Sequence, residues 1–224
     1  MEAPESASYD WGRELLKWLA IITMTLDHIG LVLYPQYTVL RYVGRLAFPL
    51  FAYLLVLGVE STRNLRSYFN RLILFAIVSQ IPFALANGVQ PWEKLNIFFT
   101  LALGLVTVYL MDMNSPFIFI PLAASFLPVD YGVYGTATVL FFYLLRRDWK
   151  VGTSLFVLVN VVLYVIEPNY QPLALLALPL ILLHNSGGLN LGGSGKAQTV
   201  FKKYFFYVYY PLHLLVLFVI KTLV

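Results

Sequence analysis

Two titratable side chains, Asp27 and His28, stand next to each other in a largely apolar run that extends from Leu15 to Tyr34. A run of this length is enough to cross a lipid bilayer as a helix. An ionised aspartate at the centre of such a helix costs about 2.5–3.5 kcal/mol on insertion scales, and side chains of this kind typically handle a proton, an ion or a substrate. We therefore interpret Asp27 and His28 as the candidate active centre.

The two side chains suit different tasks. His28 can act as a general base, because imidazole exchanges a proton near neutral pH. Asp27 can orient a partner or bind a cationic group. Because neighbours on a helix point about 100° apart, we expect the two to be separate parts of one site. The alternative is structural: arginines would neutralise the pair only to fix the packing of the helices.

Arg41 and Arg45 follow the first apolar run, four residues apart and hence on one face of a helix. Arg45 is the deeper of the two, and it can pair with Asp27 or hold an oxyanion with its planar donor fork. For Arg41, a snorkelling position at the membrane interface is an equally good interpretation. His213, near the middle of the last apolar run, fits a catalytic role and a structural role equally well.

The composition indicates a membrane protein. Of the 224 residues, 60% are hydrophobic and 12% charged, against about 45–50% and 25% in soluble domains. We therefore expect an all-α, polytopic helical bundle that forms a single domain over residues 1–224. The basic residues lie at segment ends rather than in one patch, which argues against nucleic acid as a partner. There is no cysteine, so thiol nucleophiles and cysteine-bound metals are excluded.

Turn residues and charges divide the chain into about nine apolar segments. The fifth is short enough to be re-entrant or strongly buried. The Gly- and Ser-rich stretch 185–200 is expected to be a flexible cytoplasmic loop. The segments are Leu15–Tyr34, Tyr42–Val59, Tyr68–Ala86, Asn96–Met111, Pro116–Leu127, Tyr131–Leu145, Val151–Ile166, Pro172–His184 and Tyr204–Val224.

The distribution of basic residues predicts the orientation through the positive-inside rule. With nine spans and the N-terminus inside, 11 basic residues fall at cytoplasmic ends and 4 at outer ends, which accounts for all 15. The sequence therefore predicts N-in, C-out. The outer group is Arg41, Arg45, Lys94 and Lys221.

A series of short motifs follows along nearly the whole chain: Leu16-Lys17, Asp27-His28-Ile29-Gly30, Gly44-Arg45-Leu46-Ala47-Phe48-Pro49, Gly58-Val59-Glu60-Ser61-Thr62-Arg63-Asn64, Ser79-Gln80-Ile81-Pro82-Phe83, Leu95-Asn96-Ile97, Asp130-Tyr131-Gly132 and Tyr210-Pro211-Leu212-His213. Each motif is short, but together they are specific. With them the chain resembles the TraX family of membrane acetyltransferases.

The resemblance implies acetyl transfer from cytoplasmic acetyl-CoA to an amine on the outer side of a bacterial inner membrane. The family is known for acetylating the N-terminal amine of conjugative pilin subunits. The expected acceptor is therefore a pilin or another exported peptide, or else another envelope amine or hydroxyl. His28 would be the general base, with Asp27 positioning it or recognising the acceptor's ammonium group. A covalent acetyl-histidine intermediate is a variant of this mechanism.

The same resemblance assigns the remaining polar residues. Arginines on the cytoplasmic side would hold the phosphates of acetyl-CoA, because guanidinium groups bind phosphate in bidentate fashion, although anionic lipid is an alternative partner for them. No metal is expected. The assignments are Arg63, Arg66, Arg71, Ser79 and Gln80 for acetyl-CoA; Arg41, Asp130, Tyr131 and Tyr210 for the acceptor; and Arg45, Asn96 and His213 with the catalytic pair, Arg45 or Asn96 stabilising the oxyanion.

A proton-coupled transporter or flippase of a lipid or envelope precursor is the alternative function. An intramembrane Asp-His pair with arginines on the outer side would suit it as well. Two observations argue against it: the sequence has no visible internal repeat, and its phosphate-suited arginines lie on the cytoplasmic side. A membrane scaffold, the third class, would not need these titratable groups at depth.

Overall fold

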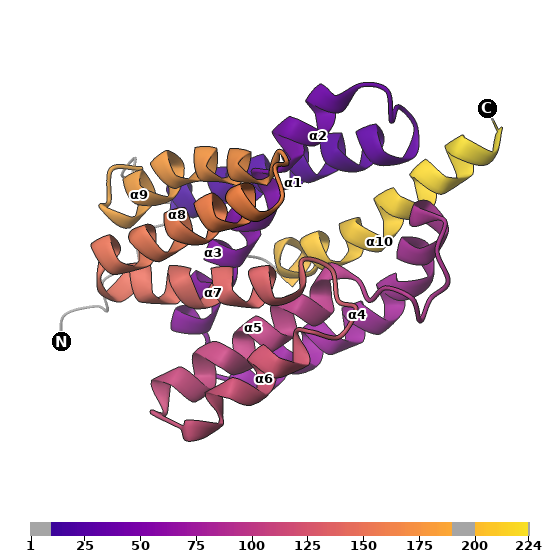
Figure 1. Ribbon diagram of the computed structural model, residues 1–224. Coiled ribbons are helices and arrows are strands. Elements are labelled where there is room, and N and C mark those ends of the chain that lie inside the picture. Colours follow the sequence, from indigo (N-terminus) through magenta and orange to yellow (C-terminus); the bar gives the residue numbers. More distant parts are fainter. Residues whose placement is uncertain (1–9, 190–199, 224) are drawn as a thin grey trace.

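A computed structural model describes residues 10–189 and 200–223 of the chain. The described part is helical, and its helices run roughly along one common direction (Figure 1). Two of the helices, η1 and η2, are short 3₁₀ segments. The helices are α1 Trp11–Val32, α2 Thr38–Gly44, α3 Ala47–Ser61, α4 Leu65–Asn87, α5 Ile97–Asp112, η1 Pro116–Ile118, α6 Phe119–Ala124, α7 Gly132–Arg147, α8 Trp149–Ile166, η2 Gln171–Ala177, α9 Leu178–Asn185 and α10 Val200–Leu223.

The predicted all-α class is confirmed, and each predicted segment corresponds to a helix or a pair of helices. Residues 38–61 are divided into α2 and α3, and residues 171–185 into η2 and α9. The segment Pro116–Leu127 is η1 followed by α6. It exposes Phe117, Phe119 and Phe126 by 62%, 72% and 83%, so of the two alternatives for this segment the strongly buried one is wrong, and the re-entrant one stays a prediction. The predicted loop at 185–200 lies largely outside the described residues.

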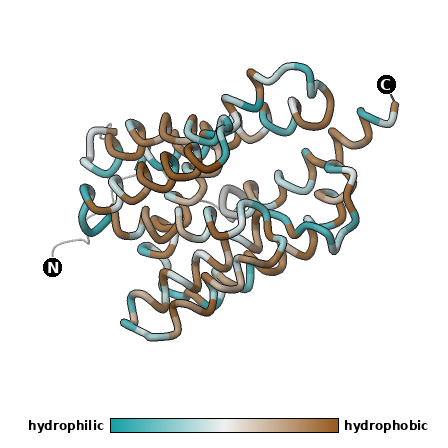
Figure 2. The backbone as a smooth tube through the Cα atoms, in the orientation of Figure 1, coloured by the Kyte–Doolittle hydropathy of each residue, from teal (hydrophilic) through white to brown (hydrophobic). Residues whose placement is uncertain are grey.

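Five stretches of helix are long and apolar enough to cross a membrane: Trp11–Val32, Thr38–Ser61, Leu65–Asn87, Trp149–Ile166 and Tyr204–Leu223. Apolar residues follow the lengths of the helices, while hydrophilic ones gather toward their ends and in the loops (Figure 2). The chain is therefore a helical membrane protein. The count of nine spans and the N-in, C-out orientation stay predictions.

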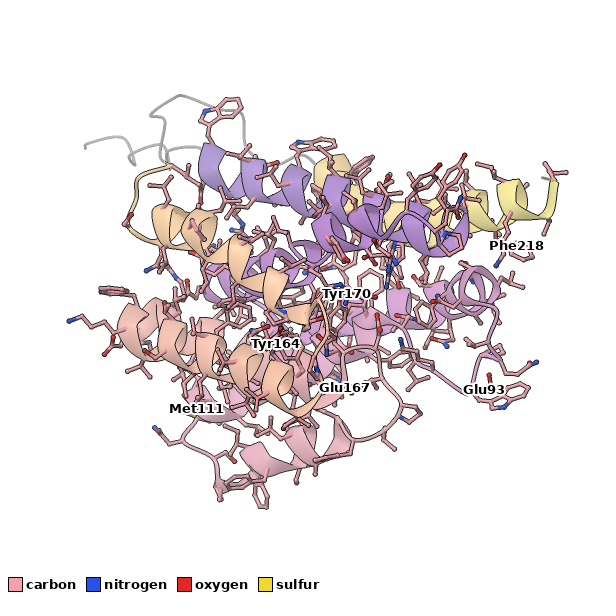
Figure 3. The ribbon with its side chains drawn as sticks, turned by 45° about the horizontal axis from the view of Figure 1, so that its top comes forward. Glu93, Met111, Tyr164, Glu167, Tyr170 and Phe218 are labelled. Atoms are coloured by element: carbon pink, nitrogen blue, oxygen red, sulfur yellow. The ribbon has the colours of Figure 1, made fainter. Side chains whose placement is uncertain are left out.

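The bundle has two distinct ends, because successive helical runs alternate in direction between them. At one end Arg146 is paired with Glu60, close to where Arg13 donates to Ser61. At the other end the ion pairs of Asp27 and of Asp130 are found. In Figure 3, Glu93 and Phe218 lie on the side of the molecule away from Met111.

Helix α3 lies in the interior and positions the others. Its residues are apolar on all sides, which is typical of a buried helix. Tyr53 is fully buried, meets Phe142 of α7 edge-on, and its hydroxyl lies 3.0 Å from His184 Nδ1. Because α1 and α7 pack on this helix, the residues of α1 are held against a fixed core.

Candidate active site

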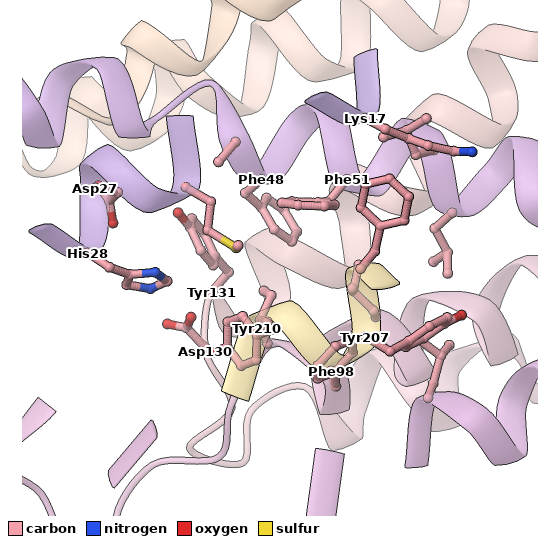
Figure 4. A pocket seen from close by; sticks show the side chains of 18 of the residues that line it. Lys17, Asp27, His28, Phe48, Phe51, Phe98, Asp130, Tyr131, Tyr207 and Tyr210 are labelled. Atoms are coloured by element: carbon pink, nitrogen blue, oxygen red, sulfur yellow. The ribbon is translucent and has the colours of Figure 1, made fainter. Parts of the chain in front are cut away.

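One cavity of about 710 Å³ runs between α1, α3, α4, α5 and α10. At about 1.5 Å per residue, Arg13 and His28 lie about 22 Å apart along α1. Figure 4 shows Lys17 toward one end of the cavity and Asp27, His28 and Asp130 at the other. We call these the Arg13 end and the His28 end. The α1 residues that line the cavity form one stripe at helical spacing: Arg13, Lys17, Met24, Asp27, His28 and Leu31.

His28 is hydrogen-bonded to a second imidazole, that of His213 on α10. His28 Nδ1 lies 2.8 Å from His213 Nε2, and His213 Nδ1 lies 2.9 Å from the carbonyl oxygen of Tyr209. A carbonyl oxygen can only accept, so His213 Nδ1 carries the hydrogen, and in the neutral ring its Nε2 is the acceptor. His28 Nδ1 must then donate. This leaves the lone pair of His28 Nε2 free to take a proton.

Aromatic contacts hold these two rings in place. Tyr209 stacks on His213 with ring centroids 5.0 Å apart, and Tyr210 meets His28 edge-on at 6.1 Å. The hydroxyl of Thr25 lies 2.8 Å from that of Tyr209, which joins α1 to α10. Among the described residues, His28 and Tyr210 line the cavity, whereas His213 does not. His213 therefore contacts two residues of the cavity lining, His28 and Tyr210, without lining the cavity itself.

Asp27 is paired with both of the predicted outer arginines. Its Oδ2 accepts from Arg41 Nη1 at 2.5 Å, and its Oδ1 lies 3.6 Å from Arg45 Nη2. Oδ1 is buried and has no hydrogen-bond partner in the described structure. The carboxylate packs against Gly44, where an added Cβ would stand 2.1 Å from Oδ1. Asp27 and His28 thus have different partners, in agreement with two separate parts of one site.

Two further residues predicted for the acceptor, Asp130 and Tyr131, also line the His28 end. Asp130 is paired with Lys94 at 2.8 Å, and Tyr131 stacks on Phe48 with centroids 4.3 Å apart. Tyr131 has a φ of 60°, a left-handed conformation that is uncommon for residues other than glycine and clusters at functional sites. Burial raises the pKa of its phenol above the ordinary value, so the hydroxyl stays protonated.

Cationic side chains line the Arg13 end of the cavity: Arg13, Lys17 and Arg71. Arg71 also borders a shallow surface pocket of about 290 Å³ on α4, together with Arg66. Arg63 is exposed and lines neither. Of the three arginines predicted for acetyl-CoA, the structure therefore brings Arg66 and Arg71 together but not Arg63. Among the residues that the structure describes, no group of three or more His, Asp and Glu side chains is placed to hold a metal ion.

Besides His213, Arg63 and Arg66, three more of the predicted site residues lie away from the cavity lining: Asn96, Ser79 and Gln80. Asn96 is fully buried at the start of α5, and its amide donates to the carbonyl of Ala76 at 2.7 Å and to Gln80 Oε1 at 2.8 Å. Gln80 donates in turn to the carbonyl of Lys94 at 2.7 Å. These bonds fasten α4 to the loop before α5. Both amide hydrogens of Asn96 are thereby engaged, and the predicted oxyanion role is not open to it in this geometry.

Several cavity residues were not predicted as site residues. Gln171 accepts from Arg45 Nη1 at 3.0 Å, and its own Nε2 is buried without a partner in the described structure. No sequence pattern points to Gln171 as a site residue, because only tertiary packing brings it beside Arg45. Arg13 and Lys17 could have been found from their spacing. They are four residues apart, and Lys17 precedes His28 by three helical turns, so all three fall on one side of the helix.

A family model described as "TraX protein" matches residues 12–221. A protein of Dichelobacter nodosus named "Probable fimbrial assembly protein FimC, serogroup H1" is 28% identical over 95% of this chain and 96% of its own length. An Escherichia coli protein named "Protein TraX" is 29% identical over 84% of this chain and 69% of its own length. No solved structure matches the chain.

Proposed function

The chain belongs to the TraX family, and from this we propose that it is a membrane-embedded acetyltransferase. It transfers the acetyl group of cytoplasmic acetyl-CoA to an amine on the outer side of the bacterial inner membrane. The acceptor in this proposal is the N-terminal amine of a pilin or of another exported peptide. The printed names of the two relatives, a TraX protein and a probable fimbrial assembly protein, agree with an acceptor of this kind.

The observation that carries the proposal is the single cavity that connects the Arg13 end with the His28 end. An acyl donor whose charged part stays at the Arg13 end can extend its thioester along α1 toward His28. The acceptor enters at the opposite end. The two substrates therefore meet without either of them crossing the membrane, which suits a donor and an acceptor from opposite sides.

In this mechanism His28 acts through Nε2, the nitrogen that its bond to His213 leaves unprotonated. An amine attacks only when it is uncharged, so Nε2 first takes a proton from the acceptor's ammonium group, which leaves an imidazolium. The free amine then forms the C–N bond as the C–S bond of the thioester breaks, and the CoA sulfur takes the proton that the new amide nitrogen loses, so that CoA leaves as a thiol. The imidazolium that results keeps donating from Nδ1 to His213 Nε2. His213 thus holds the ring of His28 in the tautomer and orientation that catalysis requires.

Asp27 and Arg45 have complementary roles at the same end of the cavity. The buried Asp27 Oδ1 lacks a hydrogen-bond partner in the described structure and suits an incoming ammonium group. Arg45 can stabilise the negative charge that develops on the thioester oxygen, while its bond to Gln171 fixes its direction. With the amide of Asn96 engaged elsewhere, the oxyanion role falls to Arg45.

The direct test uses the purified protein in lipid nanodiscs with labelled acetyl-CoA and a peptide that has a free N-terminus. We expect saturable binding of acetyl-CoA and an acetylated peptide, identified by mass spectrometry. A peptide whose N-terminus is already blocked should remain unmodified. If acetyl-CoA is neither bound nor hydrolysed, the proposal is wrong and transport becomes the better interpretation.

Replacing His213 tests how His28 is positioned. The variant His213→Gln keeps an acceptor oxygen near the position of Nε2, whereas His213→Asn is too short to supply one. We expect kcat to fall by about 10-fold or more in the Asn variant and to be largely restored in the Gln variant, with KM for acetyl-CoA similar in both. The measurement is steady-state acetyl transfer across a range of pH.

A purely structural His213 would give a different pattern. Both variants would then lose folded protein alike, and the material that stays folded would keep the wild-type pH profile. Equal kcat values for the Asn and Gln variants, at equal folded fractions, would rule out the proposed hydrogen bond as a catalytic requirement.

The absence of cysteine from the sequence allows a clean test of the proposed N-in orientation. Ser186→Cys, in the turn after α9, and Gln90→Cys, in the loop before α5, place exposed thiols at the Arg13 end and the His28 end. In intact cells a membrane-impermeant maleimide should label Cys at position 90 and not at 186. The reverse pattern would place the Arg13 end outside and overturn the orientation.

A further inference from the structure

Arg13 and Arg71, at the Arg13 end, differ in their partners from the other basic residues that line the cavity. No ion pair joins Arg13 or Arg71 to an acidic side chain in the described part of the chain, whereas Lys17 beside them is paired with Glu14 at 2.6 Å. At the His28 end, by contrast, Arg41 and Lys94 each have an aspartate. Arg13 of α1 and Arg71 of α4 thus bring two positive charges without a carboxylate partner in the described structure to one end of the cavity. Like charges repel each other, so the arrangement favours an anion between or beside them.

Both side chains turn into the cavity rather than outward to lipid. The Nε of Arg13 and the Nε of Arg71 are buried, and within the described structure neither has a hydrogen-bond partner. Their terminal nitrogens donate to neutral hydroxyls, at 3.1 Å to Ser61 and at 3.0 Å to Ser67. The guanidinium of Arg71 also lies over the ring of Tyr68 on α4, 5.3 Å from its centroid, and the hydroxyl of Tyr68 packs against Gly58 of α3. The guanidinium groups of Arg13 and Arg71 therefore both line the cavity, each with an Nε–H that has no acceptor in the described structure.

We propose that Arg13 and Arg71 form an anion clamp for the phosphate groups of the acyl donor. The inference rests on the proposed function and adds Arg13, on α1, to a cofactor site that the sequence places on α4. Guanidinium groups bind phosphate oxygens through paired N–H donors, and both Nε atoms are available for this. The shallow pocket that shares Arg71 leaves room for the rest of the nucleotide outside the membrane.

The clamp would also determine how far the thioester of the bound donor reaches along the cavity toward His28. Because Arg13 and His28 stand on one face of the same helix, about 22 Å apart, phosphates fixed at Arg13 define how far the remainder of the donor reaches along the stripe. The intervening wall contributes Met24, Leu54 and Leu55, which suit an uncharged arm. A donor that lacks the phosphates loses this anchor but keeps the path to His28.

The test compares two donors, acetyl-CoA and acetyl-pantetheine, which carries the same thioester without the nucleotide phosphates. For Arg13→Gln and Arg71→Gln we expect kcat/KM with acetyl-CoA to fall about 10-fold or more, and that with acetyl-pantetheine to stay within about twofold. Lys150→Gln is the matched control, because Lys150 is an exposed basic residue that does not line the cavity. It should leave both donors unaffected.

Binding of adenosine 3′,5′-bisphosphate provides a readout that does not need catalysis. In nanodiscs of neutral lipid its Kd should rise about 10-fold or more in either arginine variant and stay unchanged in Lys150→Gln. Equal binding by wild type and variants would overturn the clamp while leaving acetyl transfer intact. If anionic lipid abolishes the binding, the residues hold a lipid headgroup and the clamp is likewise overturned. Loss of binding in the variants of a protein that transfers no acetyl group would support the clamp and refute the proposed function.

Discussion

Replacing His28 by asparagine should lower kcat for acetyl transfer by about 10²–10⁴-fold, the usual contribution of a positioned general base. The asparagine amide stands near the position of Nδ1, so it can still donate to His213 and leave α1 and α10 joined. It has no lone pair at the position of Nε2. KM for acetyl-CoA should therefore change little, because the Arg13 end of the cavity is untouched. The measurement is single-turnover transfer to a peptide in nanodiscs.

The size of the decrease in kcat shows whether His28 acts as the general base. If His28→Asn retains full activity at neutral pH, His28 is not the base and the mechanism proposed here fails. A loss that disappears when the assay pH is raised, so that the acceptor amine is already deprotonated, would instead support it. His28→Ala removes the bond to His213 as well, and should be at least as inactive.

The second large effect is expected at Gly44, where the variant Gly44→Ala would place a methyl group on the carboxylate of Asp27. The new Cβ would stand 2.1 Å from Oδ1 and 2.5 Å from Cγ, well inside contact distance, so α2 must move or Asp27 must turn away from Arg41. Overpacking of this kind costs about 1–3 kcal/mol, and breaking a buried ion pair about 3–5 kcal/mol. We expect a lower Tm in detergent and loss of acetyl transfer.

Val43→Ala provides the control for that experiment. Val43 precedes Gly44 on the same short helix but is exposed, so its truncation should change stability by no more than about 0.5 kcal/mol. A Gly44→Ala protein with wild-type Tm and activity would contradict the close packing of Asp27 against α2. An intermediate result, with normal Tm but lost activity, would show that the carboxylate moved while the bundle held.

The fold was largely predictable, because a membrane helix can be recognised from the composition of its own stretch of sequence. A long apolar run must satisfy its own backbone hydrogen bonds, so it forms a helix wherever it is not interrupted by proline, glycine or charge. The break between α2 and α3 was not predicted, although it falls at Gly44 and Arg45, a glycine and a charge. For Pro116–Leu127 the sequence left a re-entrant and a strongly buried segment open, because apolar composition does not distinguish a segment buried in protein from one that faces lipid.

The sequence indicated the candidate site only where a charged or titratable side chain stands in an apolar segment. Asp27, His28 and Arg45 stand out because charge at depth is expensive, and the structure pairs Asp27 with Arg45. The hydrogen bond from His28 to His213 could not be read from the sequence, since it joins positions on the first and last described helices. The partners of Asn96, the carbonyl of Ala76 and Gln80 Oε1, could not be predicted either, because a sequence does not show whether a buried amide faces a substrate or joins two segments.

The hydrogen bond between His28 and His213 also has a consequence for the biogenesis of the protein. His213 follows His28 by 185 residues in the chain, so His28 acquires this partner only after α10 has been synthesised. Until α10 inserts, the cavity also lacks the wall that Tyr207 and Tyr210 provide. A partly synthesised chain therefore has neither an oriented imidazole nor an enclosed path for the thioester. In the proposed mechanism, transfer therefore requires that α10 has already packed against α1.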